Sequence, residues 1–230
     1  LYNSADASLL LFEAVNKYLE YTGNYDFVKN NLYSQMKSII NYYIDGITLD
    51  GNNIYLDEKD YLIVSGTDKT QNTWMDAKVN NIPVTPRNGK AVEINALWYN
   101  ALRIMQKLNF KWNHIAGQVE YAYLANKCRK SFIKEFYNPN KKCLYDVIKK
   151  VKKENPKAPT IDNRYSFIQV EKDDKVRPNQ LFSLSVSYPV IDCKTEIARN
   201  ILITTTQKLL NKYGLRTLAK GEPGYIGVYE

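Results

Sequence analysis

Apolar residues recur at helical spacing along most of this chain. One such stretch begins after Asn3 or Ser4, either of which can cap a helix, and ends near Gly23. A second covers 25–45 and stops at Gly46. Further helical patterns cover 92–108, 112–136 (closed by Asn138-Pro139), 178–184, where Pro178 suits the first helical position, and a last helix capped by Asp192 and ending at Tyr213-Gly214. The chain therefore contains six expected helices.

Alternating patterns predict strands between some of these helices. Asp50-Gly51 lies between alternating runs in ITLDGNNIYLDEKDYLIVSG, which is typical of a β-hairpin. LYDVI and YSFIQV are expected to form short strands around a Lys- and Pro-rich excursion, and VIKKVKKENPKAP at 147–159 is typical of a solvated loop. Long amphipathic helices in antiparallel pairs predict an all-α domain, either a bundle or a closed ring of helical hairpins with short hairpins in its loops.

One irregular segment combines residues that rarely occur together in a loop. TWMDAKV at 73–79 continues to Glu93 through Pro83, Pro86 and Gly89, which keep the backbone irregular. A large aromatic side chain in such a loop needs something to pack against. Trp74 therefore either covers the edge of the core or forms a platform for a ligand on which Asp76 acts.

Composition narrows the class of protein. The 230 residues are 44% hydrophobic and 24% charged, which is ordinary for a soluble globular protein, and no apolar run approaches the roughly 18 residues of a membrane span. The net charge of +8 comes mostly from scattered Lys, without Arg-rich stripes or a nucleic-acid reader motif. We therefore expect a Lys-rich soluble surface, with neither a nucleic acid nor a membrane as partner.

The few histidine and cysteine residues leave Asp and Glu side chains as the candidates for acid–base chemistry. His114 is the single histidine, which excludes Ser–His–Asp and Cys–His chemistry and a multi-histidine metal site within these residues. Cys128, Cys143 and Cys193 lack metal-ligand spacing, so we expect reduced, partly buried thiols of a cytoplasmic protein. We expect neither a metal nor a cofactor.

Six motifs in order carry a resemblance to a known family. They are YNSADASLLLFEA at 2–14, TWMDAKV at 73–79, VTPRNGKAVEINALWYNAL at 84–102, LYDV at 144–147, RPNQLFSLS at 177–185 and YGLRTL at 213–218. Together they resemble the amylo-α-1,6-glucosidase domain of glycogen debranching enzymes, the archaeal and bacterial form in particular. The resemblance covers nearly the whole chain.

The resemblance implies a fold and an activity. It implies an (α/α)6 barrel that hydrolyses α-1,6-linked glucose at branch stubs of glycogen or a branched oligosaccharide, with inversion and without a metal. Asp76 matches the general acid of the family. The general base is expected past YGLRTL, after a motif like HQGTVWPW and so beyond Glu230. We therefore expect 1–230 to be part of one catalytic domain, with an unclosed barrel and a parent chain that continues on both sides.

Hydrolysis of a glycosidic bond, which is an acetal, requires a proton donor such as the carboxyl group of Asp76. An inverting glycosidase needs one carboxylic acid to protonate the leaving oxygen and a second carboxylate, roughly 6.5–9.5 Å away, to activate water. Burial against an aromatic face favours the protonated form of a carboxyl group, and Trp74, two residues before Asp76, is the expected source of that burial. From the residues alone, a role for Asp76 in capping a helix or a turn is favoured over the acid role, and the resemblance reverses that preference.

Sugars are held by aromatic faces and by planar polar groups that take two hydroxyls. Three of the candidate sugar-binding residues also have a structural explanation. Trp98 could be a core residue, Asp6 a carboxylate that the helix dipole favours, and Arg177 a structural ion-pair residue. Glu93 is the other carboxylate considered as a base, although the Lys and Arg nearby favour a ligand-orienting role. The candidate substrate-binding residues are Asp6, Trp74, Lys78, Arg87, Glu93, Asn95, Trp98, Arg177, Asn179 and Gln180.

Two alternatives stay open. The chain could belong to a non-catalytic carbohydrate-binding helical domain, or to another (α/α)6 glucosidase of the glucoamylase or trehalase type. Because the second carboxylate is expected beyond Glu230, we expect little or no hydrolysis by residues 1–230 alone.

Overall fold

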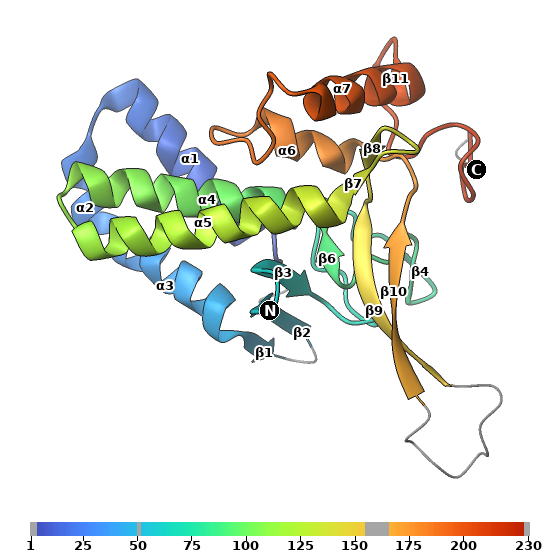
Figure 1. Cartoon of the computed structure of the whole chain (residues 1–230), viewed down its shortest axis with the longest axis horizontal. Helices are drawn as coiled ribbons and strands as arrows, with labels where there is room; N and C mark the ends of the chain where they lie inside the picture. Colours follow the sequence, from blue (N-terminus) through green and yellow to red (C-terminus); the bar gives the residue numbers. More distant parts are fainter. Residues whose placement is uncertain (1–3, 50–51, 155–165, 228–230) are drawn as a thin grey trace.

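The protein mixes helices and sheets, as a computed structural model of residues 4–49, 52–154 and 166–227 shows (Figure 1). Within these residues, twelve strands form five antiparallel sheets beside the helices. The predicted all-α (α/α)6 barrel is therefore wrong. The segments between helices pair into antiparallel ladders. Asn52–Asp57 alternates in the manner of a half-buried strand and pairs with Leu62–Ser65, which is mostly buried.

The first helices differ from the prediction in one place. Helix α1 (Ala7–Thr22) ends at Gly23, whose φ of 65° is the left-handed cap that glycine favours. The expected helix over 25–45 is two helices, α2 (Tyr25–Asn31) and α3 (Tyr33–Asp45), with a break at Leu32. In one straight helix, positions 28 and 36 would lie about 80° apart around the axis. With the break, both Val28 and Met36 are fully buried.

The central pair of helices forms the core. Helix α4 (Val92–Lys111) and helix α5 (Ile115–Phe136) run antiparallel beside one another (Figure 1). The first eleven residues of α4 are buried all round, as expected for a helix enclosed by other elements. The prediction missed the boundaries by three residues, because the turn at 112–114 belongs to neither helix.

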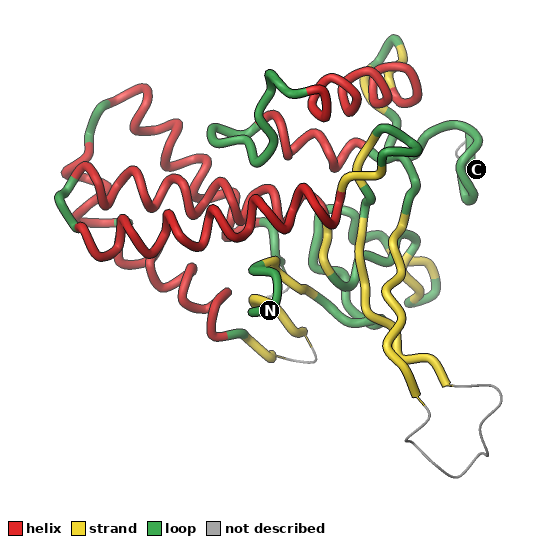
Figure 2. Tube along the Cα trace, viewed as in Figure 1, coloured by secondary structure: helices red, strands yellow, loops and turns green. Residues whose placement is uncertain are grey.

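Two three-stranded sheets border the helices (Figure 2). In the first, β1 (Ile47–Leu49), β2 (Asn52–Asp57) and β3 (Leu62–Ser65) pair in sequence, which confirms the predicted hairpin, although its Asp50-Gly51 turn lies outside the described residues. In the second, β9 (Val147–Glu154) pairs with both β10 (Ser166–Asp173) and β6 (Lys90–Ala91).

The Lys-rich stretch at 147–159 is thus not simply a solvated loop. Residues 147–154 form β9, as the LYDVI pattern predicted in part, and the YSFIQV strand is also confirmed; the rest of the stretch lies outside the described residues. A bridge between Ser65 and Gly89 joins the two sheets.

Several shorter elements complete the fold. The end of the chain contains η2 (Pro178–Leu181), α6 (Phe182–Ser185) and α7 (Glu196–Leu209), and Pro178 begins the first of these as predicted. The two-stranded hairpins are β4 (Lys78–Val79) with β5 (Ile82–Pro83), β7 (Tyr137–Asn138) with β8 (Cys143–Leu144), and β11 (Leu210–Asn211) with β12 (Gly214–Leu215).

The last long helix begins and ends elsewhere than predicted. Its cap is Thr195, whose hydroxyl accepts the N–H of Ala198 at 3.3 Å, while Asp192 caps the preceding turn by accepting the N–H of Lys194. The helix ends at Leu209, because the next residues turn back as the β11–β12 hairpin.

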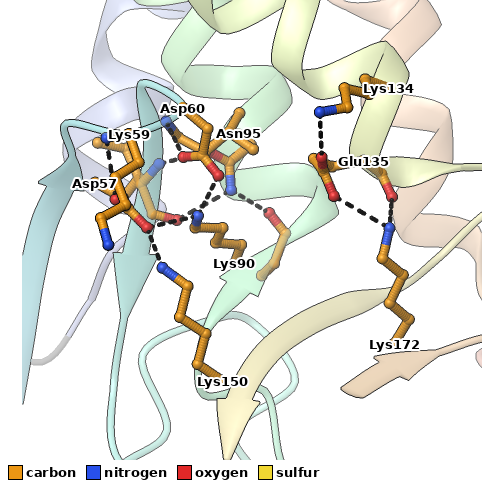
Figure 3. A network of polar contacts seen from close by, with 12 residues as sticks. Asp57, Lys59, Asp60, Lys90, Asn95, Lys134, Glu135, Lys150 and Lys172 are labelled. Atoms are coloured by element: carbon orange, nitrogen blue, oxygen red, sulfur yellow. Dashed lines mark hydrogen bonds and ion pairs between the residues drawn. The ribbon is translucent and has the colours of Figure 1, made fainter. Parts of the chain in front are cut away.

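A buried lysine connects the two sheets (Figure 3). Lys90 of β6 donates to Asp57 at 2.8 Å and pairs with Asp60, and Lys150 of β9 donates to Asp57 at 2.7 Å. Although burial raises the pKa of Asp57, hydrogen bonds from Lys150 and Lys90 hold it well below its usual range.

Two further expectations concern cysteines and membranes. All three cysteines are free, with Cys128 and Cys143 buried and Cys193 exposed. Among the described residues, no helix is both long enough and apolar enough to cross a bilayer.

Candidate functional site

A hollow of about 430 Å³ lies between the start of α1 and the TWMD loop. Asp6 lies on one side of it, and Trp74 and Asp76 lie on the other. The full lining is Ser4, Asp6, Ala7, Leu10, Gln71, Asn72, Thr73, Trp74 and Asp76. Ligand pockets in proteins commonly enclose about 300–1,000 Å³, so the hollow has room for a small molecule.

Backbone contacts hold the two sides of this hollow together. The N–H of Ala5 donates to the carbonyl of Asn72 at 2.7 Å, and the hydroxyl of Tyr43 donates to the carbonyl of Ala5 at 2.7 Å. Burial, and after it the charge of Asp6, raises the pKa of Tyr43, so its hydroxyl stays a donor. The hydroxyl of Ser4 accepts the N–H of Ala7 and donates to Asp6, which places that carboxylate at the helix start.

Three consecutive residues beneath the hollow are buried polar residues with unused hydrogen-bonding groups. Gln71, Asn72 and Thr73 are 5–8% exposed. Gln71 Nε2, both amide atoms of Asn72 and Thr73 Oγ1 have no hydrogen-bond partner within the described part of the chain. Buried polar groups are normally paired, so four unpaired ones beside a hollow are unusual. Each of these atoms has almost no accessible surface, so a ligand in the hollow reaches them only when the side chains turn toward it.

The indole and the carboxylate of the TWMD motif are both accessible. Trp74 is 48% exposed, and its Nε1–H donates to Asn179 Oδ1 at 3.0 Å. Asp76 is exposed, so the expectation that Trp74 partly buries it is wrong in this structure. The loop turns the carboxylate outward because the residues that follow it form the exposed β4–β5 hairpin.

A buried ionic cluster lies behind Trp74 and is centred on Asp146. Arg87 donates to Asp146 and to Glu93, all three residues being nearly inaccessible. Arg177 Nε lies 3.4 Å from Asp146 Oδ2, and Asn179 Nδ2 donates to Asp146 Oδ1 at 2.9 Å. Four of the predicted residues, from two separate motifs, are thus brought together around Asp146, which belongs to a third motif.

Burial and neighbouring charges shift the pKa values of Glu93 and Arg87 in this cluster. Burial raises the pKa of Glu93 to about 7, and the neighbouring charge of Asp146 raises it further against the opposing effect of Arg87. Although burial lowers the pKa of Arg87, its two carboxylate partners raise it, so the guanidinium stays charged.

The remaining predicted residues lie elsewhere. Asn95 is fully buried and bonds to the backbone of Ile63 and Ala91. Trp98 has no exposed surface and stacks on Tyr43, 5.8 Å between ring centroids, so it does not line the hollow. Gln180 is buried; its side-chain oxygen accepts the N–H of Leu144, and its amide donates to the carbonyl of Arg177. Lys78 is exposed on β4, outside the hollow.

Sequence reasoning missed Asp146 and the three unpaired residues. Asp146 stands in the LYDV motif, which was recognised as a motif without a role for its carboxylate. Gln71, Asn72 and Thr73 directly precede Trp74, but nothing in a polar loop sequence indicates that its side chains are buried.

Comparison with known proteins identifies the family of this chain. The family model of the amylo-alpha-1,6-glucosidase matches residues 1–230. The glycogen debranching enzyme of Saccharomyces cerevisiae is 26% identical over 194 residues, a match that covers 76% of this chain and 12% of the yeast protein. The chain thus spans a small part of that relative. Because the family match extends over the whole chain, the protein belongs to the amylo-alpha-1,6-glucosidase family.

Proposed function

We propose that this chain forms part of the catalytic domain of a glycoside hydrolase that releases glucose from α-1,6 branch points of glycogen or limit dextrin. The family membership supports the reaction class, and the yeast relative is named a glycogen debranching enzyme. The observation that carries the proposal is the hollow that Asp6, Trp74 and Asp76 line together with Asn72 and Thr73.

Asp76 is the general acid in this proposal. Its carboxyl group lies at the edge of the hollow and forms no ion pair with another described residue. A glucose that occupies the hollow closes it to water and brings its glycosidic oxygen within reach of this carboxyl group. The acid then protonates the glycosidic oxygen as the bond to the anomeric carbon breaks.

In this proposal, the second carboxylate comes from another part of the protein than the TWMD loop. In an inverting reaction, that carboxylate takes a proton from a water on the opposite face of the sugar, and the water oxygen bonds to the anomeric carbon. No metal takes part in these steps, so a chelator is expected to leave turnover unchanged.

Sugar recognition falls to the remaining lining of the hollow. An indole that is half exposed offers its face to the C–H surface of a glucose ring. When they turn toward the sugar, the unpaired amide of Asn72 and hydroxyl of Thr73 supply both donors and acceptors, as sugar hydroxyls require.

The decisive experiment is Asp76→Asn in the protein at its natural length. We expect glucose release from panose and limit dextrin to fall by at least about a thousandfold while panose still binds, because the amide keeps the shape but cannot supply the proton. Asp45→Asn, which removes an exposed carboxylate at the end of α3, is the matched control and should keep full activity. Near-normal glucose release by Asp76→Asn would exclude the acid role.

The same assay separates hydrolysis from binding alone. If the natural-length protein binds panose at this hollow but releases no glucose, the chain serves a non-catalytic carbohydrate-binding domain. If trehalose or α-1,4-linked maltose is hydrolysed in preference to panose, the specificity is that of another glucosidase.

A further inference from the structure

Asp146 is built into a fixed position between three elements. Its backbone N–H donates to the carbonyl of Asp173 at the end of β10 at 2.8 Å. Its backbone carbonyl accepts the N–H of Val92 at the start of α4 at 3.0 Å. The side chain is 2% exposed, so neither the backbone nor the carboxylate of Asp146 can move without disturbing its neighbours.

The carboxylate of Asp146 lies beside two arginines. Oδ2 accepts from Arg87 and lies 3.4 Å from Arg177 Nε. Arg177 is in turn held by the carbonyl of Thr217 at 3.3 Å. An ionised carboxylate only accepts hydrogen bonds, so the group next to Oδ1 has to be a donor.

That requirement fixes the orientation of the Asn179 amide. Asn179 is 1% exposed, and its Nδ2 donates to Asp146 Oδ1 at 2.9 Å. With the amide nitrogen facing Asp146, the amide oxygen faces the other way and accepts the indole N–H of Trp74 at 3.0 Å. A flipped amide would bring two acceptors together at Asp146 and two donors together at Trp74.

The end of this chain of hydrogen bonds is the aromatic wall of the hollow. Trp74 is half exposed, and its indole N–H donates to Asn179. A ring on a loop between two irregular segments has many orientations open to it, and ordering such a side chain on binding costs affinity. Anchoring the N–H edge leaves the ring face available for the ligand.

We propose that Asp146 is a positioning residue which, through the Asn179 amide, holds the Trp74 indole in the orientation that receives the sugar. The inference rests on the proposed carbohydrate function for its ligand, but the hydrogen-bonded chain itself can be tested without any sugar.

The first test is spectroscopic. In nitrogen-15-labelled protein at its natural length, the indole N–H signal of Trp74 is assigned by its loss in Trp74→Phe. In Asp146→Asn, residue 146 offers a donor as well as an acceptor, so the Asn179 amide is no longer confined to one orientation. We expect the Trp74 signal to shift and its exchange with solvent to accelerate about tenfold, with no such change in the control Asp192→Asn. An unchanged Trp74 signal in folded Asp146→Asn would overturn the inference.

The second test is functional and uses panose. Trp74→Phe keeps an aromatic face but lacks the N–H, so it removes the anchor without disturbing the buried ions. We expect a five- to tenfold rise in KM with kcat changed less than about twofold, as for one lost hydrogen bond. Asp146→Asn should give a similar KM effect, and the double variant should show little more than either alone.

The outcomes distinguish the two proposals. If Asp146→Asn does not fold, Trp74→Phe alone decides: an unchanged KM overturns the positioning role. Additive effects of the two substitutions on KM also overturn it, because they mean that Asp146 does not act through Trp74. If Asp76→Asn keeps its activity, the proposed general acid is wrong, while the shift of the Trp74 signal still tests Asp146.

Discussion

Asn95 is hydrogen-bonded to both backbone groups of Ile63. The N–H of Ile63 donates to Asn95 Oδ1 at 2.6 Å, and Asn95 Nδ2 donates to the carbonyl of Ile63 at 3.1 Å and to that of Ala91 at 2.9 Å. Since β3 is the edge strand of its sheet, the side chain from α4 takes the place of a neighbouring strand. The helix and the sheet are joined by an amide as well as by apolar packing.

Replacing Asn95 should therefore cost stability. Asn95→Ala leaves the buried N–H and carbonyl of Ile63 without that partner, and we expect the free energy of unfolding to fall by about 2–4 kcal/mol. Urea denaturation measures this value. Asn31→Ala, which removes an exposed amide bonded to Phe27, is the control and should cost less than about 1 kcal/mol. Equal losses in the two variants would contradict the structural role of Asn95.

Glu93 should make stability depend on pH. Its pKa is raised by burial from 4.5 to about 7, so between these values the folded protein binds more protons than the unfolded chain. The free energy of unfolding should therefore decrease as the pH rises from 4.5 to 7, by up to about 3 kcal/mol, and level off above pH 7. Because Glu93→Gln cannot ionise, its stability curve should lack this decrease. Parallel curves for the two proteins would show that Glu93 is not the titrating group.

Lys90 and Lys150 should differ sharply although both donate to Asp57. Lys90 is 7% exposed and pairs with two carboxylates, whereas Lys150 is half exposed. Lys90→Met leaves the partly buried Asp60 without the cation it pairs with and Asp57 with Lys150 alone, and we expect a loss of about 3–5 kcal/mol. Lys150→Met should cost less than about 1 kcal/mol. Thermal and urea unfolding of both variants at pH 7 compare them directly.

Gly89 should not tolerate a side chain. Its φ is 111°, and a Cβ added there would lie 2.6 Å from the carbonyl oxygen of Ile148 on β9. Gly89→Ala therefore has to move β6 away from β9, and we expect a loss of at least about 2 kcal/mol. Gly23, also at positive φ but with open space around it, provides the comparison: Gly23→Ala should cost only about 1 kcal/mol. Similar losses would mean that φ alone, without the close approach, accounts for the effect.

Local patterns predicted the elements better than the architecture. The helices over 92–108 and 112–136 and the hairpin around Asp50-Gly51 follow from spacing and turn residues, which are properties of adjacent positions. The break at Leu32 has no Gly or Pro to indicate it. Asn80 and Asn81, both at positive φ, form the turn of β4–β5, and their pairing resembles the preferred two-residue hairpin turns. The Asn80-Asn81 pair is therefore a turn signal that the sequence alone contains.

The site was predictable by its motifs and not by its contacts. Resemblance selected Trp74, Arg87, Glu93 and Asn179, yet what each one does depends on partners up to 105 positions away. No periodicity encodes the pairing of Arg87 with Asp146, or separates a buried Trp98 from an exposed Trp74. The all-α expectation failed for the same reason, since the pairing of β6 with β9 joins segments more than fifty residues apart.

The contact between Ala5 and Asn72 has a consequence for heating. One wall of the hollow depends on the first turn of α1, and the ends of helices open at lower free energies than the core. As temperature rises, that turn should fray before α4 and α5 separate. Affinity for sugar would then fade in a range where circular dichroism still reports a folded protein.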